Sequence, residues 1–155
     1  EALQNFLDVV RVFEKNGRQE SPVLSPGMLD KHYSPRAKVA FIALSDPQKY
    51  LPLLKQAIQR DLTAGSKTGA LIVEEEREWF AQNFPQVNTF VLGRRLDLQH
   101  IASRLYAGLR ALDEKGAERI YVHDFGGQGL GMAIRDRLMR AAEVVINGSI
   151  HEQQL

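Results

Sequence analysis

The sequence predicts an α/β protein: a three-layer α/β/α domain with a mostly parallel sheet of four or five strands, preceded by a helix and an extended linker. Short apolar runs alternate with longer amphipathic segments through short loops, which is typical of right-handed strand–helix–strand crossovers. The first run, Val39 to Leu44, is continuously apolar, as expected for a strand buried on both faces of a parallel sheet. The pattern does not reveal the order of the strands.

The chain ahead of this pattern has two parts. Residues 1–16 predict a short amphipathic helix, because apolar side chains recur at helical spacing at Leu3, Phe6, Leu7, Val10 and Phe13. The apolar residues of 17–38 follow neither the helical period nor the strand period, and the prolines of this segment favour extended backbone. We therefore expect an extended linker over 17–38 and the α/β domain over 39–155.

Within the domain, each element follows from its own pattern. Strands are expected over 39–44, 69–73, 88–92, 119–123 and, as a short fifth, 144–146. Helices are expected over about 48–63, 74–83, 98–115 and from the turn at 126–131 to about 142. Asp97 is the expected N-cap of the longest helix, and Gly116 its end. We interpret the acidic run Glu74–Glu76 as a charged helix start that complements the helix dipole.

Composition excludes several classes of function. Twenty Lys and Arg against nineteen Asp and Glu leave a net charge of +1, so no basic field argues for dominant phosphate-backbone binding. The absence of cysteine excludes disulfides, thiolate zinc sites and a cysteine nucleophile. No apolar run approaches the roughly 18–20 residues that span a bilayer. We expect a cytoplasmic protein with no membrane partner and no metal site.

The linker holds an unusual density of functional groups. Lys31, His32 and Tyr33 lie between two prolines, and extended backbone would place Lys31 and Tyr33 on one side and His32 on the other. A cation and an aromatic ring at this spacing could meet the phosphate and the base of a nucleotide. The alternative is a solvated tether whose His and Tyr pack locally.

The same segment resembles the linker of the Sua5/YrdC/YwlC family of threonylcarbamoyl-AMP synthases. Nine of eleven positions match the family pattern S-P-G-M-x-x-[RK]-H-Y-[AS]-P: Ser25, Pro26, Gly27, Met28, Lys31, His32, Tyr33, Ser34 and Pro35. Asp30 departs from the family, so no ligand contact is expected there. The resemblance implies a catalytic YrdC-like domain, then this linker, then a Rossmann-like Sua5 domain.

By that resemblance, the linker closes over the nucleotide of the catalytic domain. The implied lid residues are Ser25, Pro26, Gly27, Met28, Lys31, His32, Tyr33 and Pro35. Residues 1–16 resemble only the final element of the catalytic domain, so no catalytic residue or cofactor is expected in this chain. ATP and Mg²⁺ belong to the parent enzyme, a nucleotidyltransferase that makes threonylcarbamoyl-adenylate for the t6A modification of tRNA. The implied partners are the catalytic domain in cis or in trans, ATP or AMP, and indirectly the tRNA-modification machinery.

A glycine-rich turn opens the last helix and is a possible anion site. Its residues are Gly126, Gly127, Gly129, Gly131, Arg135 and Arg137. Outward-pointing N–H groups at a helix N-terminus favour an anion, although the spacing is not that of a dinucleotide fingerprint. Alternatively, the glycines permit a tight turn and close helix–sheet packing. Residues 129–142 also resemble the end of the Sua5 domain.

Three functions stay open. The leading hypothesis is a regulatory domain that carries the lid of a catalytic partner. A second is an independent nucleotide- or phosphate-binding module, possibly ATP-hydrolysing, built on the turn at 126–131. A third is a purely structural docking domain. His123 and Asp124 lie at the carboxyl end of a predicted strand, where α/β proteins place ligands, and so receive a small weight as a further site. Two adjacent residues do not make a metal site.

Overall fold

A computed structural model describes residues 36–148 as a five-stranded sheet in which every pair of neighbouring strands is parallel. The strands are β1 (Lys38–Ile42), β2 (Thr68–Val73), β3 (Asn88–Gly93), β4 (Arg119–His123) and β5 (Ala142–Ile146). Their order across the sheet is β3-β2-β4-β1-β5. The expected fold class is confirmed, including the short fifth strand.

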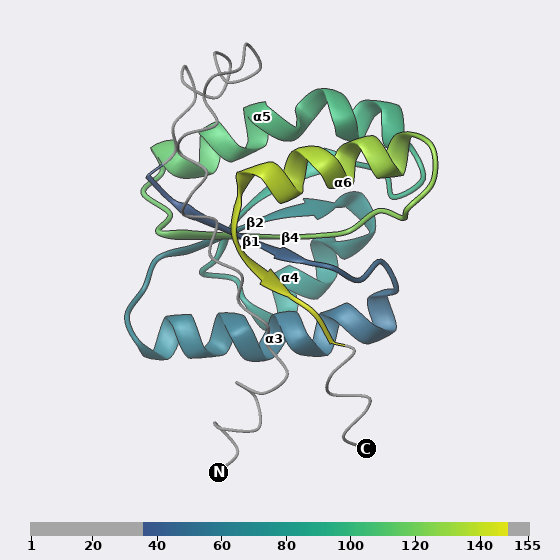
Figure 1. Cartoon of the computed structure of the whole chain (residues 1–155). Helices are drawn as coiled ribbons and strands as arrows, with labels where there is room; N and C mark the ends of the chain where they lie inside the picture. Colours follow the sequence, from purple (N-terminus) through teal and green to yellow (C-terminus); the bar gives the residue numbers. More distant parts are fainter. Residues whose placement is uncertain (1–35, 149–155) are drawn as a thin grey trace.

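Helices cover both faces of this sheet (Figure 1). One face carries α3 (Pro47–Thr63) and α4 (Arg77–Asn83), and the other carries α5 (Leu98–Glu114) and α6 (Leu130–Ala141). The α5 N-cap is Asp97, whose carboxylate accepts the His100 N–H at 3.2 Å, as expected. Gly116 follows the end of α5 with φ of +91°, a backbone conformation that favours glycine.

The core has two halves, one on each face of the sheet. Successive side chains of a strand point to opposite faces, so Val39 and Phe41 pack on the side of α5 and α6, while Ala40 and Ile42 pack on the side of α3 and α4. Each of these four residues is at most 1% exposed. The continuous apolar run of β1 therefore reflects burial on both faces, as predicted.

One predicted element differs in the structure. The helix expected from residue 74 begins as a 3-10 turn, η2 (Glu74–Glu76), and becomes α-helical only in α4. The reason is local: Glu76 turns back into the protein, where its Oε1 accepts the Val73 N–H at 3.2 Å. The other strands and helices match their expected bounds to within two residues.

The topology brings diverging loops together at the carboxyl edge of the sheet. The chain leaves β2 toward the face of α4 and leaves β4 toward the face of α6, although β2 and β4 are neighbours. Doubly wound α/β proteins bind ligands in the crevice that such divergence creates. A ligand-binding site is therefore expected at the carboxyl ends of β2 and β4.

Most of the segment before the domain lies outside the described residues. This applies to the helix expected over 1–16 and to nearly all of the linker expected over 17–38, so both stay predictions. The described chain begins at Arg36, and β1 begins at Lys38, one residue before the expected start of the domain.

Candidate functional site

The lid residues expected in the linker lie outside the described part of the chain. They are Ser25, Pro26, Gly27, Met28, Lys31, His32, Tyr33 and Pro35. Their role stays a prediction. The possible anion site and the carboxyl edge of the sheet lie within residues 36–148 and can be described in full.

The glycine-rich turn lies between β4 and α6 and is shaped by close backbone contacts. Gly126 and Gly129 have φ of +104° and +55°, which favour glycine. A Cβ on Gly131 would lie 2.8 Å from the Gly126 backbone oxygen and 2.9 Å from that of Phe125. Backbone atoms cannot move aside cheaply, so the glycine at 131 is required by packing between the turn and α6.

The arginines expected beside this turn do not converge on an open site. The Arg135 guanidinium donates to both carboxylate oxygens of Asp124, at 3.1 and 2.5 Å. This hydrogen bond raises the pKa of Arg135, more than burial lowers it. The same guanidinium lies against Gly127, and Arg137 is exposed on α6. The anion site stays a prediction, while these contacts favour the packing interpretation of the glycines.

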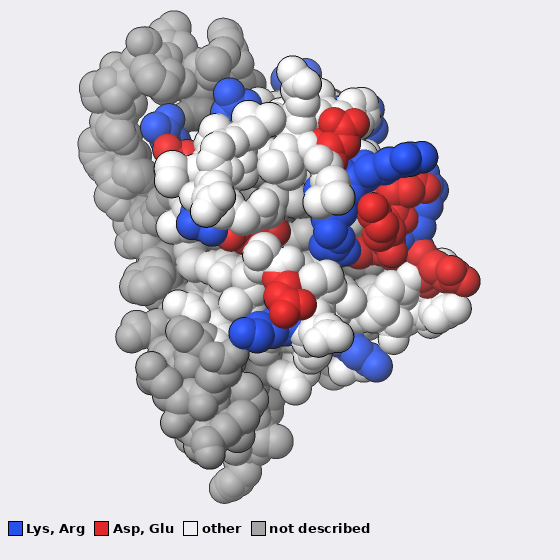
Figure 2. Space-filling model, turned by 90° about the vertical axis from the view of Figure 1, so that its right-hand side faces the viewer, with Lys and Arg blue, Asp and Glu red and all other residues white. Residues whose placement is uncertain are grey.

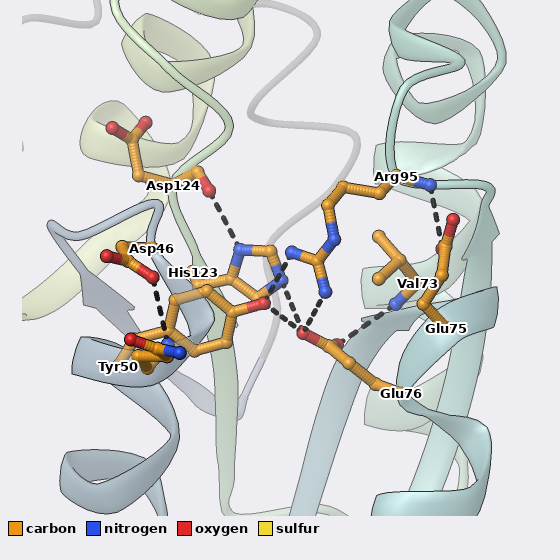
Figure 3. A network of polar contacts seen from close by, with 9 residues as sticks. Asp46, Tyr50, Val73, Glu75, Glu76, Arg95, His123 and Asp124 are labelled. Carbon is orange, nitrogen blue, oxygen red and sulfur yellow. Dashed lines mark hydrogen bonds and ion pairs between the residues drawn. The ribbon is translucent and has the colours of Figure 1, made fainter.

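A buried polar cluster, which we call the Glu76 cluster, fills the crevice between the carboxyl ends of β2 and β4. It consists of Tyr50, Glu76, Arg95 and His123, which come from α3, η2, the β3–α5 loop and β4 (Figure 3). The Glu76 and His123 side chains are each 3% exposed, and Tyr50 is fully buried. Charged groups are rarely buried to this degree unless they are paired.

Glu76 is the acceptor at the centre of this cluster. The Tyr50 hydroxyl donates a hydrogen bond to Glu76 Oε2, and Arg95 Nη2 lies 3.5 Å from the same oxygen. His123 Nε2 also lies 3.0 Å from it, at the distance of an ion pair but without good hydrogen-bond alignment. Arg95 Nη1 donates to the Tyr50 hydroxyl at 2.7 Å. The four side chains form one connected network.

Both ring nitrogens of His123 face oxygen atoms. Its Nδ1 lies 2.8 Å from the backbone oxygen of Asp124. Its Nε2 lies 3.0 Å from Glu76 Oε2. The ring stacks on Tyr50, with centroids 4.0 Å apart and planes 14° apart, and tilts against Phe125.

These contacts shift the acid–base properties of the cluster. Burial alone would raise the pKa of Glu76, but its close contact with His123, with the Tyr50 and Val73 donors, outweighs burial and holds the pKa below its ordinary value. Burial, followed by the Glu76 charge and hydrogen bond, raises the pKa of Tyr50 above 10.0. For Arg95, burial lowers the pKa, but Tyr50 and Glu76 outweigh it and the pKa is raised. Glu76 is therefore a carboxylate and Tyr50 a neutral donor at neutral pH.

The hollow beside the Glu76 cluster is small. Glu76 and His123 line it together with core residues such as Phe80 and Tyr121, and its volume of about 10 Å³ is close to the minimum for one water molecule. Groups of three or more His, Cys, Asp or Glu that could hold a metal ion are absent from the described residues. The four side chains of the cluster lie at the edge of the sheet where a doubly wound fold binds a ligand.

The exposed carboxyl edge is mixed in charge. Figure 2 shows acidic and basic side chains next to one another on this face, rather than a field of one sign. Arg77 pairs with Glu74 at 2.9 Å, and the Arg95 N–H donates to Glu75 Oε1 at 2.9 Å. Such a surface does not attract polyanions over a long range. None of the helices of the described part of the chain is both long and apolar enough to cross a membrane.

Sequence reasoning missed the Glu76 cluster for an identifiable reason. The interpretation of Glu74–Glu76 as a charged helix start that complements the helix dipole fits Glu74 but does not account for Glu76, which is buried. His123 received small weight because only its neighbour in sequence was considered. The available signal was that an acid and an arginine follow two of the parallel strands and a histidine ends a third, so that all three reach the same edge.

The comparisons with known proteins agree with one another. Residues 1–143 match the family described as the C-terminal domain of threonylcarbamoyl-AMP synthase. Threonylcarbamoyl-AMP synthases are similar to this chain in Bacillus subtilis (30% identity, 92% of this chain and 38% of the relative) and Schizosaccharomyces pombe (34%, 82% and 31%). A third, from Pyrococcus abyssi, is 27% identical over 81% of this chain and 34% of the relative. The chain thus spans about a third of the length of these relatives.

Solved structures are similar in fold. The Pyrococcus abyssi Sua5 complexed with L-threonine aligns with a TM-score of 0.61 and 24% identity, over 74% of this chain and 31% of that chain. The C-terminal Sua5 domain from Pyrococcus horikoshii aligns with a TM-score of 0.56 and 19% identity, over 74% of this chain and 99% of that chain.

Proposed function

Because this chain belongs to the family of threonylcarbamoyl-AMP synthase C-terminal domains, we propose that it is the accessory part of such a synthase. The catalytic partner is a YrdC-like domain, in cis or in trans, that makes threonylcarbamoyl-adenylate from threonine, bicarbonate and ATP for the t6A modification of tRNA in the cytoplasm. The linker motif Ser25–Pro35 closes over the nucleotide of that partner, and His32 and Tyr33 make the contacts.

The single observation that carries this proposal is the family match over residues 1–143. It includes both the linker motif and the glycine-rich turn, with strands β1 to β4 between them. Within the described domain, the side chains of the Glu76 cluster pair with one another at the carboxyl edge of the sheet. ATP and Mg²⁺ are then ligands of the catalytic partner.

The test is reconstitution with a purified YrdC-like catalytic domain. We expect the chain, added to saturation, to change the rate of ATP-dependent pyrophosphate release or the KM for ATP. The double variant His32→Ala with Tyr33→Ala should abolish that change while leaving the fold of the α/β domain intact by circular dichroism. An unchanged rate and KM with the native chain would contradict the accessory role and favour a purely structural docking domain.

Calorimetry with ATP and AMP separates this proposal from an independent nucleotide-binding module. We expect no heat of binding to the isolated chain at millimolar nucleotide, because Arg135 is held by Asp124 and Gly131 packs against backbone. Binding that is lost in Arg137→Ala would instead assign the nucleotide to the turn at 126–131.

A further inference from the structure

A larger hollow, which we call the amino-edge hollow, lies at the edge of the sheet opposite the Glu76 cluster. It is situated where β1 and β4 begin and where α3 and α5 end, and its volume is about 610 Å³. Ligand pockets of proteins usually have volumes of about 300–1,000 Å³. Seven of the ten described residues that line the hollow are charged, which favours a ligand that itself carries charge.

Two basic side chains lie next to one another at this edge. Lys38 and Arg119 begin β1 and β4 and are partners in the parallel register. Their side chains point to the face of α3, because Ala40 and Tyr121, two positions further along each strand, pack on that side. Like charges in directly opposite positions repel one another. A carboxylate placed between Lys38 and Arg119 would relieve this repulsion.

The acid on this face relieves the repulsion only in part. Asp61 Oδ2 lies 4.0 Å from Arg119 Nε, a long distance for an ion pair, and the same oxygen accepts a hydrogen bond from the Tyr121 hydroxyl at 2.6 Å. Within the described part of the chain, the Lys38 side chain has no ion-pair partner. The basic side of the hollow therefore keeps positive charge that a ligand can meet.

The end of α5 makes the other side of the hollow negative. Asp113 and Glu114 are the last two residues of α5, and the last turn of this helix contains no basic residue. The C-terminal end of a helix also carries a negative partial charge, which favours a cation. Asp113 Oδ1 accepts the backbone N–H of Arg36 at 3.0 Å, whereas Glu114 is exposed and forms no ion pair with another described residue.

The two remaining charged residues of the lining do not reverse this polarity. Arg36 and Glu118 have opposite signs, and Glu118 Oε1 already accepts the Lys67 N–H at 2.9 Å. The hollow thus has a basic side at the starts of β1 and β4 and an acidic side at the end of α5. A ligand that matches both sides carries a negative group at one end and a positive group at the other.

We propose that the amino-edge hollow binds a short zwitterionic peptide. Its terminal carboxylate lies between Lys38 and Arg119, and its terminal ammonium faces Asp113 and Glu114. Helices α3 and α5 lie on opposite faces of the sheet (Figure 1), so the two charges of the ligand are met from different sides. One carbon atom separates the two charges of a free α-amino acid, whereas a peptide separates them by about 3.3–3.6 Å for each residue. This inference does not depend on the proposed function.

Titration of the 155-residue chain with triglycine, followed by amide chemical shifts in NMR at low salt, tests the proposal. We expect saturable shifts at Lys38, Glu114 and Arg119, and none at Glu76 and His123 on the opposite edge of the sheet. Low salt is used because screening weakens contacts between exposed charges. Shifts confined to the opposite edge, or no saturable shift up to about 10 mM triglycine, would overturn the proposal.

Capped forms of the same peptide test the recognition of each charge separately. N-acetyl-triglycine lacks the ammonium, and triglycine amide lacks the carboxylate. We expect each capped form to bind about tenfold more weakly than triglycine, and free glycine to bind at least as weakly as the capped forms. Equal affinities for triglycine and both capped peptides would overturn the proposal, because the hollow would then not recognise either charge.

Two variants assign the charges to their sides of the hollow. Lys38→Met keeps the apolar stem of an exposed side chain, and it should reduce the preference for triglycine over triglycine amide from about tenfold to below about threefold. Glu114→Gln should reduce the preference for triglycine over N-acetyl-triglycine in the same way. The matched controls Lys55→Met and Glu78→Gln change exposed residues of α3 and α4 and should keep both preferences. Unchanged preferences in Lys38→Met and Glu114→Gln would overturn the assigned orientation and the proposal with it.

Discussion

Replacing the central acid of the Glu76 cluster should strongly destabilise the domain. Glu76→Gln keeps the shape of the side chain but removes its charge, so the Arg95 and His123 side chains lose the carboxylate that they face at 3.5 and 3.0 Å. Gln also introduces an NH₂ group where the structure has only an acceptor, opposite the Tyr50 hydroxyl donor. Both changes act at the Glu76 side chain, which is 3% exposed.

The magnitude follows from that burial. Removing one partner of a buried ion pair costs about 3–5 kcal/mol, and a hydrogen bond to a charged group contributes about 1.5–3 kcal/mol. Because Gln keeps one oxygen for either Val73 or Tyr50, we expect the free energy of unfolding to fall by about 3–5 kcal/mol, not by the sum. At an m-value of about 2 kcal/mol per molar urea, the midpoint should shift by roughly 2 M.

Urea unfolding at neutral pH measures this loss. Trp79, the single tryptophan of the sequence, packs edge-on against Phe80 at 4.9 Å and against Phe84 at 5.8 Å, so its fluorescence reports the native core next to the cluster. The matched control is Glu74→Gln in the same acidic run. Glu74 pairs with Arg77 at the surface, and such pairs contribute about 0–1 kcal/mol.

The comparison of the two variants decides the outcome. A loss below about 1 kcal/mol for Glu76→Gln, or equal losses for both variants, would refute the argument that the cluster stabilises the domain. A variant too unstable to purify would agree in direction with the prediction. In that case the milder Tyr50→Phe gives the measurable value.

Three further predictions concern the carboxyl edge. Tyr50→Phe removes the hydroxyl but keeps the ring on His123, so unfolding by urea should show a loss of about 1.5–3 kcal/mol; no loss would contradict the hydrogen bond to Glu76. Because the folded pKa of Glu76 lies below 4.5, its contribution is complete above the pKa of the unfolded chain and is lost as pH falls through the lower folded pKa. Urea midpoints of the native chain and Glu76→Gln should therefore approach one another progressively as the pH falls below 4.5, and a constant gap would argue against this titration. Gly131→Ala places a Cβ 2.8 Å from the Gly126 oxygen and should lower stability by about 1–3 kcal/mol in thermal unfolding. Ala has a better helix propensity than Gly, which alone would raise the Tm. A higher Tm for Gly131→Ala would therefore show that the backbone of the turn moves aside for the added Cβ.

The sequence was sufficient to predict features that depend on residues close together in the chain. The N-cap at Asp97 and the end of α5 at Gly116 were predicted because caps are read from neighbouring residues. The double burial of β1 was predicted because the run from Val39 to Leu44 is continuously apolar. The family was identified from the motif that begins at Ser25, which is also local.

The acidic run shows where local reasoning stops. Glu74 and Glu76 have the same type of side chain two positions apart, and the sequence offers no difference between them. Glu74 pairs with Arg77 in solvent, whereas Glu76 turns toward Tyr50, 26 residues away, and Arg95, 19 residues away. Only the fold determines which of the two acids is buried.

The sequence by itself determined the α/β class, nearly all element bounds and the linker motif that identifies the family. Tertiary structure alone decided the strand order β3-β2-β4-β1-β5. That order makes β2 and β4 neighbours and so joins Glu76 to His123, and the α5–β1 contact likewise joins Asp113 to Arg36. The physical reason is that helix and strand periods report only which face of an element is buried, whereas the partner of that face depends on how distant elements pack.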